Sequence, residues 1–340
     1  MDSDIKTFLQ QQHGFIMSKV IFTACELGVF DLLMTSQSPL TAAAIAERLG
    51  TSQAGTERLL DACVGLKLLR VERKENTGFY GNEEVANLCL AKSSPKSQYN
   101  FMKLHSEYIY PSMQYLADAV REGKSQIQSI HGPSSKNIFD ALYSSKEMFE
   151  KFMNAMDDTW SLYGREVLSA FNLSDFPHIC DVGGAGGTLA KECISLYPKS
   201  TVTMFDLPEV IGRAKENFVC PEESQIVFQE GDFFKDPVPE ANLYVLARVL
   251  HDWDDGTCVQ LLTKLHKACK PGGGVLVVEI IFNEDKTGPL EAHLYSILML
   301  LLTEGKERTI SEYSALFNAA GFKKMEAKKG NLYTAILGKK

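Results

Sequence analysis

A run of glycines in the second half of the chain, from Gly183 to Gly187, has the composition of a loop that lets a ligand approach the backbone closely. The dinucleotide pattern Gly-x-Gly-x-x-Gly is not met, because counting from Gly184 places the third glycine at Leu189. Counting from Gly183 places the second glycine at Ala185. The sequence therefore disfavours a pyrophosphate-binding loop, and an NAD-dependent oxidoreductase is kept only as an alternative.

Acidic and aromatic residues follow the next two apolar segments. Asp206 comes about twenty residues after the glycine run, where a carboxylate can accept both ribose hydroxyls of a nucleoside. In Gly231-Asp232-Phe233, the carboxylate can accept from an adenine amino group while the phenyl ring lies against the base. A nucleoside without a pyrophosphate describes S-adenosylmethionine, whose carboxylate would face the helix N-terminus after the loop. The simpler alternatives are an ordinary glycine turn and an aspartate that caps a helix.

A histidine follows the fourth apolar segment, in Leu250-His251-Asp252-Trp253. At the mouth of a sheet it is a candidate general base for an aromatic hydroxyl, which has a pKa of about 10. An imidazole with a pKa of about 6.5 falls short by roughly 3.5 units, or about 5 kcal/mol, so proton transfer is expected to be coupled to methyl transfer. Either Glu279 or Glu307 is expected to orient the ring, and the sequence leaves both open.

The acidic residues near the histidine do not have the spacing of a metal site. Asp254 and Asp255 are explained by a solvated loop, so a magnesium-dependent catechol mechanism is disfavoured and no metal is expected. A catalytically silent dimeric binding protein remains a further alternative.

These residues fall within a region where apolar strands alternate with helices, which predicts a mostly parallel α/β sheet covered on both faces. Helices are expected at 256–269 and 310–320. The predicted strands are 178–182, 201–205, 225–229, 242–246 and 274–280, with a C-terminal pair near Phe322 and Tyr333.

The N-terminal part of the chain has the order helix, turn, helix, hairpin, which is a winged-helix outline and otherwise all-helical. Thr41 is expected to cap a helix that Gly50 ends, a second helix to span 54–69, and a hairpin over 71–80 to turn near Thr77-Gly78. The second helix is too apolar for a DNA-reading helix, so packing against another helix or subunit is favoured. We predict an N-terminal domain over 1–110, connecting helices over 111–172 and an S-adenosylmethionine-binding domain over 173–340; the family resemblance described below implies that the first is a dimerisation domain and the last a methyltransferase domain.

Composition limits the remaining classes of function. The chain has 340 residues, 45% of them hydrophobic, and a formal net charge of -8, which argues against a general nucleic-acid or anionic-membrane binder. Eight cysteines form no Cys-x-x-Cys pair and are expected to be buried, reduced thiols of a cytoplasmic protein. Neither a signal peptide nor a membrane-spanning segment is expected.

Several motifs together resemble the small-molecule O-methyltransferases of plants and animals, over essentially the whole chain. Within that family, the chain is most similar to the vertebrate acetylserotonin O-methyltransferases. The motifs are Asp181 to Gly187, Phe205 to Pro208, Glu230 to Phe234, Leu250 to Trp253, Lys270 to Gly274 and Thr303 to Thr309, with support from Ala24 to Leu33, Asp118 to Gly123 and Gly231 to Pro237.

The resemblance implies a homodimer with interlocked N-terminal helices, His251 as general base and Asp252 near the substrate. It implies that N-acetylserotonin is methylated to melatonin. It also implies cofactor contacts from Tyr143, Trp160, Gly183, Asp206, Gly231, Asp232, Phe233 and Arg248.

One pair of residues departs from that subgroup. Leu298 and Leu302 stand where the acetylserotonin enzymes carry an Asn and a Gln facing the substrate amide. Leucines can neither donate nor accept hydrogen bonds, so an alternative substrate is a less polar phenol or indole.

Overall fold

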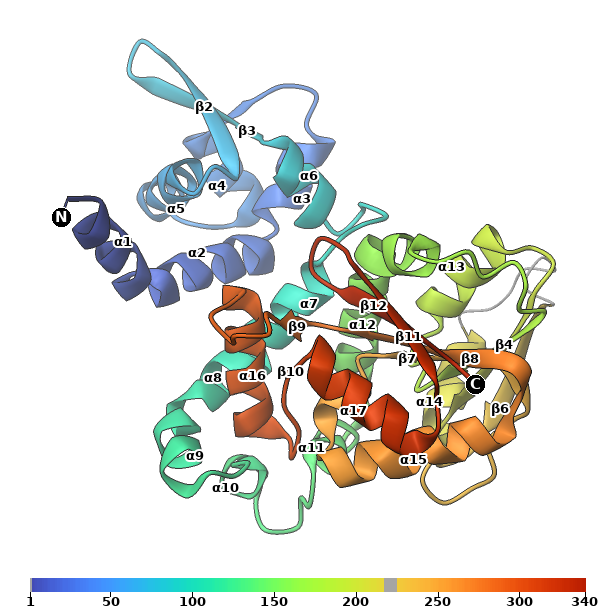
Figure 1. The fold of residues 1–340 in the computed structure, drawn as a ribbon. Helices are drawn as coiled ribbons and strands as arrows, with labels where there is room; N and C mark the ends of the chain where they lie inside the picture. The colour runs from blue at the N-terminus through green and yellow to red at the C-terminus, as the bar shows by residue number, and fades with distance from the viewer. Residues whose placement is uncertain (1, 217–224) are drawn as a thin grey trace. The chain divides into compact units, whose positions relative to one another are not determined.

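The computed structural model describes residues 2–216 and 225–340, and the chain forms two compact units, 1–111 and 112–340. Figure 1 shows the order of the elements along the chain. Cys220 lies outside the described residues. None of the described helices is long and apolar enough to span a membrane.

The first unit combines short helices with a small antiparallel sheet, in which the strand order is β1-β3-β2. Its Thr41 caps α4 by accepting from the Ala44 N–H at 3.2 Å, and Gly50 ends that helix in the left-handed conformation, as expected. Its elements are α1 (Asp2–Gln12), α2 (Gly14–Leu27), α3 (Val29–Thr35), β1 (Leu40–Thr41), α4 (Ala42–Leu49), α5 (Gln53–Gly65), β2 (Leu69–Lys74), β3 (Thr77–Asn82), α6 (Glu84–Cys89), α7 (Tyr99–Leu104) and η1 (His105–Ile109).

Three details of this unit differ from the sequence prediction. The second helix ends at Gly65, not at residue 69, because Lys67 has a φ of 60° and Leu69 already begins a strand. The hairpin turns at Glu75 and Asn76, both with positive φ, as in the tightest two-residue loops. Outside the hairpin the unit was expected to be all-helical, but β1 adds a third strand to the sheet.

The second unit begins with helices that lead to the long α12, which Ser145 caps by accepting from the Met148 N–H. Between α8 (Tyr110–Ser112) and the sheet lie η2 (Met113–Tyr115), α9 (Leu116–Glu122), α10 (Ile127–His131), α11 (Ile138–Leu142) and α12 (Lys146–Ser169).

A seven-stranded sheet forms the centre of this unit, in the order β11-β12-β8-β7-β4-β5-β6. The five neighbouring strands β8, β7, β4, β5 and β6 run parallel to one another. At one edge, β12 is antiparallel to β8 and β11 is antiparallel to β12. This confirms the predicted, mostly parallel α/β sheet. The strands are β4 (His178–Val182), β5 (Thr201–Asp206), β6 (Ile226–Glu230), β7 (Ala241–Ala247), β8 (Cys269–Glu279), β11 (Lys324–Lys329) and β12 (Thr334–Lys339).

Helices cover both faces of the sheet, because successive strand side chains point to opposite sides and both sides are apolar. One core packs α12, α13 (Thr188–Leu196) and α14 (Pro208–Glu216) against residues such as Ile179 and Val278. The other packs α15 (Asp255–Ala268) and α17 (Ile310–Ala320) against Val182 and Val277. The remaining elements are η4 (Leu250–Asp252), α16 (Leu290–Leu302) and the short pair β9 (Ile281–Phe282) and β10 (Arg308–Thr309).

Candidate active site

A cavity of about 770 Å³ lies at the carboxyl ends of the parallel strands. This is the end of an α/β sheet where ligands bind. The expected residues Tyr143, Trp160, Gly183, Asp206, Asp232, Phe233, Arg248 and Asp252 line it. Gly231 does not, although its N–H donates to the Asp206 carbonyl oxygen at 2.9 Å and so joins two strand ends.

The glycine loop after β4 is packed against α12. A side chain at Gly186 would overlap the Asp157 carboxylate, which accepts from the Thr188 hydroxyl at 2.7 Å and from Arg213 at 3.1 Å. Arg213 also donates to Asn154 at 2.6 Å. These contacts hold the loop, α12 and α14 together beside the cavity.

Asp206 ends β5 with both carboxylate oxygens turned toward backbone N–H groups. Oδ2 accepts from Ala185 at 3.0 Å and Oδ1 from Leu207 at 2.8 Å. Burial raises the pKa of Asp206 to about 6, although the two N–H groups act to lower it. Each oxygen keeps a further lone pair, so the carboxylate can accept from two hydroxyls of a ligand.

Asp232 and its neighbours form another wall of the cavity. The carboxylate of Asp232 accepts from the Phe234 N–H at 2.8 Å and from the Lys235 ammonium at 2.7 Å. Burial acts to raise its pKa, but the contacts with Lys235 and the backbone lower it overall. Asp232 is therefore an ionised acceptor at neutral pH.

Two aromatic rings that the sequence analysis missed, those of Phe139 and Phe152, complete this wall. Phe139 stacks on Trp253 with centroids 6.0 Å apart, and Phe234 meets the same indole edge-on at 4.8 Å. Phe139 comes from α11, and Phe152 from α12 also lines the cavity. The aromatic residues clustered in sequence from 139 to 152 were the available signal.

His251 lies in η4, directly after β7, and is only 6% exposed. Its Nε2 is 3.0 Å from the Arg248 carbonyl oxygen, so Nε2 donates, and Nδ1 lies 2.8 Å from Met299 Sδ. Burial lowers the pKa of His251 well below its usual value, and the Arg248 charge lowers it further. The ring is neutral, and its own side chain does not line the cavity that Arg248 and Asp252 border.

The two candidate glutamates reach different parts of His251. Glu307 Oε1 is 3.8 Å from Nδ1 of the ring. Glu279 Oε1 instead accepts from the N–H groups of Val249, Leu250 and His251, at 3.2, 3.0 and 3.3 Å. Glu307 thus lies beside the imidazole ring, whereas Glu279 binds the backbone N–H groups of the turn that carries it.

Arg248 lies between the same two carboxylates. Its Nη1 is 3.0 Å from Glu279 and 2.8 Å from Glu307; both glutamate side chains are buried, and that of Arg248 is 10% exposed. Burial raises the pKa of Glu279 to about 8, while the Arg248 charge acts to lower it. Burial also raises the pKa of Asp252 to about 7, and Asp252 Oδ2 is 3.6 Å from Nε2 of His251.

Leu298 and Leu302 both lie on α16, the helix that carries Met299. Leu302 is 2% exposed and Leu298 is half-buried, and neither lines the described cavity. Within the part of the chain that the structure describes, no group of three His, Cys, Asp or Glu residues could hold a metal ion.

Comparison with known proteins identifies both parts of the chain. Residues 113–323 match the model of the O-methyltransferase domain, and residues 9–92 match the O-methyltransferase dimerisation domain. Acetylserotonin O-methyltransferase of Gallus gallus is 56% identical, over 97% of this chain and 96% of its own. The Homo sapiens enzyme of that name is 51% identical, over 96% and 95%. The crystal structure of human N-acetylserotonin methyltransferase in complex with SAM has a TM-score of 0.95 at 49% identity, over 100% of this chain and 98% of that one.

Proposed function

The chain belongs to the acetylserotonin O-methyltransferase family, and on that premise we propose that it transfers the methyl group of S-adenosylmethionine to the hydroxyl of N-acetylserotonin, giving melatonin. The observation that carries this proposal is the meeting of two features at one end of the sheet. One is a cavity bordered by Asp206 and Asp232. The other is the neutral His251, which comes three residues after Arg248, and Arg248 lines that cavity.

The residues of the cavity fit S-adenosylmethionine. Asp206 would accept from the ribose hydroxyls, Asp232 from the adenine amino group, and the Gly183 loop would admit the methionine part. The neighbouring Phe233 would lie against the base, and Tyr143, Trp160 and Arg248 of the cavity lining would make further contacts. Gly231 would act beside the cavity, where its N–H holds the Asp206 carbonyl. When bound, the sulfonium supplies a methyl group that is already activated for transfer.

His251 would take the proton from the substrate hydroxyl. Because Nε2 donates to the Arg248 carbonyl, Nδ1 is the nitrogen that carries the lone pair, and Met299 Sδ lies 2.8 Å from it. A buried imidazole is a weaker base than a free one, so full deprotonation of a phenol before attack would cost more than about 5 kcal/mol. Proton transfer coupled to methyl transfer avoids that cost.

The charge that His251 would gain has acceptors nearby. The carboxylates of Glu307 and Asp252 lie 3.8 and 3.6 Å from the two ring nitrogens. We assign Glu307 to stabilising the ring once Nδ1 has gained the proton, and Glu279 to holding its backbone. Asp252, which borders the cavity, would lie near the substrate.

The apolar pair Leu298 and Leu302 supports a second candidate substrate, a less polar phenol or indole. Both residues lie on α16, the helix whose Met299 contacts the His251 ring. Neither can hydrogen-bond an amide.

We propose that the protein works as a homodimer in the cytosol. The match to a dimerisation domain and the exposed apolar side chains of α1 and α2 support the first part. The cytosolic location is supported by the seven described cysteines, all of them free thiols. Exposed residues on these helices are Ile5, Phe8, Leu9, Phe15 and Ile16.

The proposal is tested with a radiolabelled methyl donor and a panel of hydroxyindoles, flavonoids and simple phenols, alongside titrations with S-adenosylmethionine and NAD. We expect saturable binding of S-adenosylmethionine only, and label transferred most efficiently to N-acetylserotonin. Preference for an apolar phenol would replace the named substrate. Binding of S-adenosylmethionine without transfer to any acceptor would favour a silent binding protein.

A further inference from the structure

The turn that carries His251 and Asp252 is held at both ends by buried side chains, the carboxyl group of Glu279 and the guanidinium of Arg308. Glu279 accepts from the N–H groups at its start, as described above. At its other end, the carbonyl oxygens of Leu250 and Trp253 point toward the side chain of Arg308. This single helical turn therefore lies between the carboxyl group of Glu279, at its N–H side, and the guanidinium of Arg308, at its carbonyl side.

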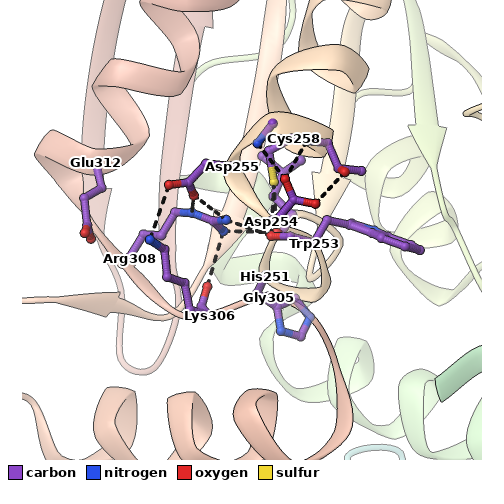
Figure 2. Close-up of polar contacts among 12 residues, drawn as sticks. His251, Trp253, Asp254, Asp255, Cys258, Gly305, Lys306, Arg308 and Glu312 are labelled. Atoms are coloured by element: carbon purple, nitrogen blue, oxygen red, sulfur yellow. Dashed lines mark hydrogen bonds and ion pairs between the residues drawn. The ribbon is translucent and has the colours of Figure 1, made fainter. Parts of the chain in front are cut away.

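Arg308 is completely buried and uses its donors on this turn. Nη1 donates to the Leu250 carbonyl at 3.1 Å, and Nη2 donates to the Trp253 carbonyl at 2.7 Å. Nε donates to Asp255 at 2.8 Å, and Nη1 also reaches the Lys306 carbonyl at 3.3 Å. Figure 2 shows the guanidinium between Asp255 and Trp253, with the His251 ring on the far side of the turn.

The backbone next to Arg308 packs against the same turn. A side chain at Gly305 would overlap the carbonyl oxygen of His251 and the peptide between Asp252 and Trp253. The segment from Gly305 to Arg308 therefore presses on the turn while the guanidinium binds its two carbonyls. Cys258 donates weakly to the same Leu250 carbonyl at 3.2 Å.

The ion pair with Asp255 does not by itself explain why the Arg308 side chain is buried. Asp255 is 55% exposed, so pairing with it gives little stability, while the burial of a guanidinium costs desolvation. That cost is offset by the bonds to the carbonyls. Only a planar fork of five donors can reach both carbonyls and the carboxylate at once, which a lysine ammonium cannot do.

We propose that Arg308 is a positioning residue for methyl transfer, because its guanidinium holds the Leu250 and Trp253 carbonyls and so fixes the places of His251 and Asp252. The inference rests on the proposed function. Trp253, whose carbonyl Arg308 binds, also lines the cavity, but the proposed acceptors of the cofactor, Asp206 and Asp232, have other partners. We therefore expect the main effect of Arg308 on turnover and not on cofactor binding. Displacement of a reacting group by about 1 Å can cost about 100-fold in rate.

The test compares Arg308→Lys and Arg308→Ala with the full-length wild type. We measure kcat and KM for the acceptor, the Kd for S-adenosylmethionine and the midpoint of thermal unfolding, and we add guanidinium chloride at low concentration to the alanine variant. Two variants serve as controls. Lys306→Ala removes an exposed ammonium 3.3 Å from the same Asp255, and Asp255→Asn removes the ion pair of Arg308 but leaves its carbonyl bonds.

We expect Arg308→Lys to lower kcat about 10- to 100-fold, with the cofactor Kd within about twofold of the wild type. Guanidinium should restore part of the rate of Arg308→Ala, and both controls should keep nearly the wild-type kcat. A kcat of Arg308→Lys near the wild-type value would overturn the inference. So would an equal loss in Asp255→Asn, which would assign the effect to the ion pair.

Loss of cofactor binding together with turnover in both Arg308 variants would also contradict it, because Arg308 would then support the fold as a whole. Inactivity of the wild type on every acceptor would overturn the proposed function and this inference with it. An active wild type with an unaffected Arg308→Lys would overturn the positioning role alone.

Discussion

The imidazole of His251 donates from Nε2 to the backbone carbonyl of Arg248, at 3.0 Å. Arg248 has a φ of 57°, a left-handed conformation that is uncommon outside glycine and that coincides with this contact. The bond selects one neutral tautomer and leaves Nδ1 as the accepting nitrogen. The backbone of Arg248 therefore decides which nitrogen of His251 can accept a proton, and Arg248 also borders the cavity.

The affinity for S-adenosylmethionine should fall in mild acid. Burial raises the pKa of Asp206 to about 6, and ribose hydroxyls bind its ionised form. A ligand that prefers the ionised form binds fully above that pKa and loses affinity as the pH falls below it, by at most about tenfold per unit. Calorimetric titration at pH 7.5 and pH 5 should show this rise in Kd. Asp206→Asn should bind more weakly and lack the pH dependence, and an identical dependence in that variant would remove Asp206 as its source.

An added methyl group in the glycine loop should weaken cofactor binding. Gly186→Ala would push on the Asp157 carboxylate, which holds Thr188 and Arg213, so we expect loss of about 1–3 kcal/mol in the free energy of unfolding and a higher Kd. Gly212→Ala is the matched control, because nothing lies within 4 Å of that position in α14. It should be neutral or stabilising by up to about 1 kcal/mol. Equal effects of both changes on Kd would contradict the packing argument.

The sheet and its strand ends were predictable because they follow from local pattern. Apolar segments bounded by turns predicted β4 to β7 to within one residue at each end, but β8 begins at Cys269, five residues before its predicted start. The rule for parallel sheets predicted that Asp206 and Asp232 meet at one edge. The start of α4 followed from the capping chemistry of Thr41.

The rest depended on how distant segments pack. Nothing in the sequence near Met299 indicates that its sulfur meets the His251 ring, because the register of α16 against the sheet is set by tertiary contacts. The same holds for the aromatic wall from Phe139, and for Glu279, which reaches the backbone of the histidine and not its ring. The roles of the site residues stay predictions.

Polar residues at the two leucines should shift substrate preference. Leu298→Asn with Leu302→Gln is expected to improve kcat/KM for N-acetylserotonin relative to apolar phenols, since amides can pair with the substrate amide. Leu302 is 2% exposed, so its replacement should also cost about 1–3 kcal/mol of stability, measured by denaturant unfolding. Leu298→Asn alone, at a half-buried position, should be better tolerated. An unchanged preference in both variants would mean that the amide is bound elsewhere.

Charges on the N-terminal helices should dissociate the proposed homodimer. Phe8 and Phe15 are 62% and 60% exposed, and Phe8→Asp with Phe15→Asp would place carboxylates in an apolar interface. Sedimentation velocity should show a monomer. Val227→Asp, at an apolar position 46% exposed on the edge strand β6, should leave the dimer intact. A dimer that survives the double change would exclude these two side chains from its interface.

The most direct test of the account is the single-turnover rate of methyl transfer by His251→Ala, with S-adenosylmethionine and acceptor at saturation. The account predicts a rate about 100- to 10,000-fold below the wild type, with the Kd for S-adenosylmethionine nearly unchanged. A rate equal to that of the wild type would show that His251 does not accept the proton.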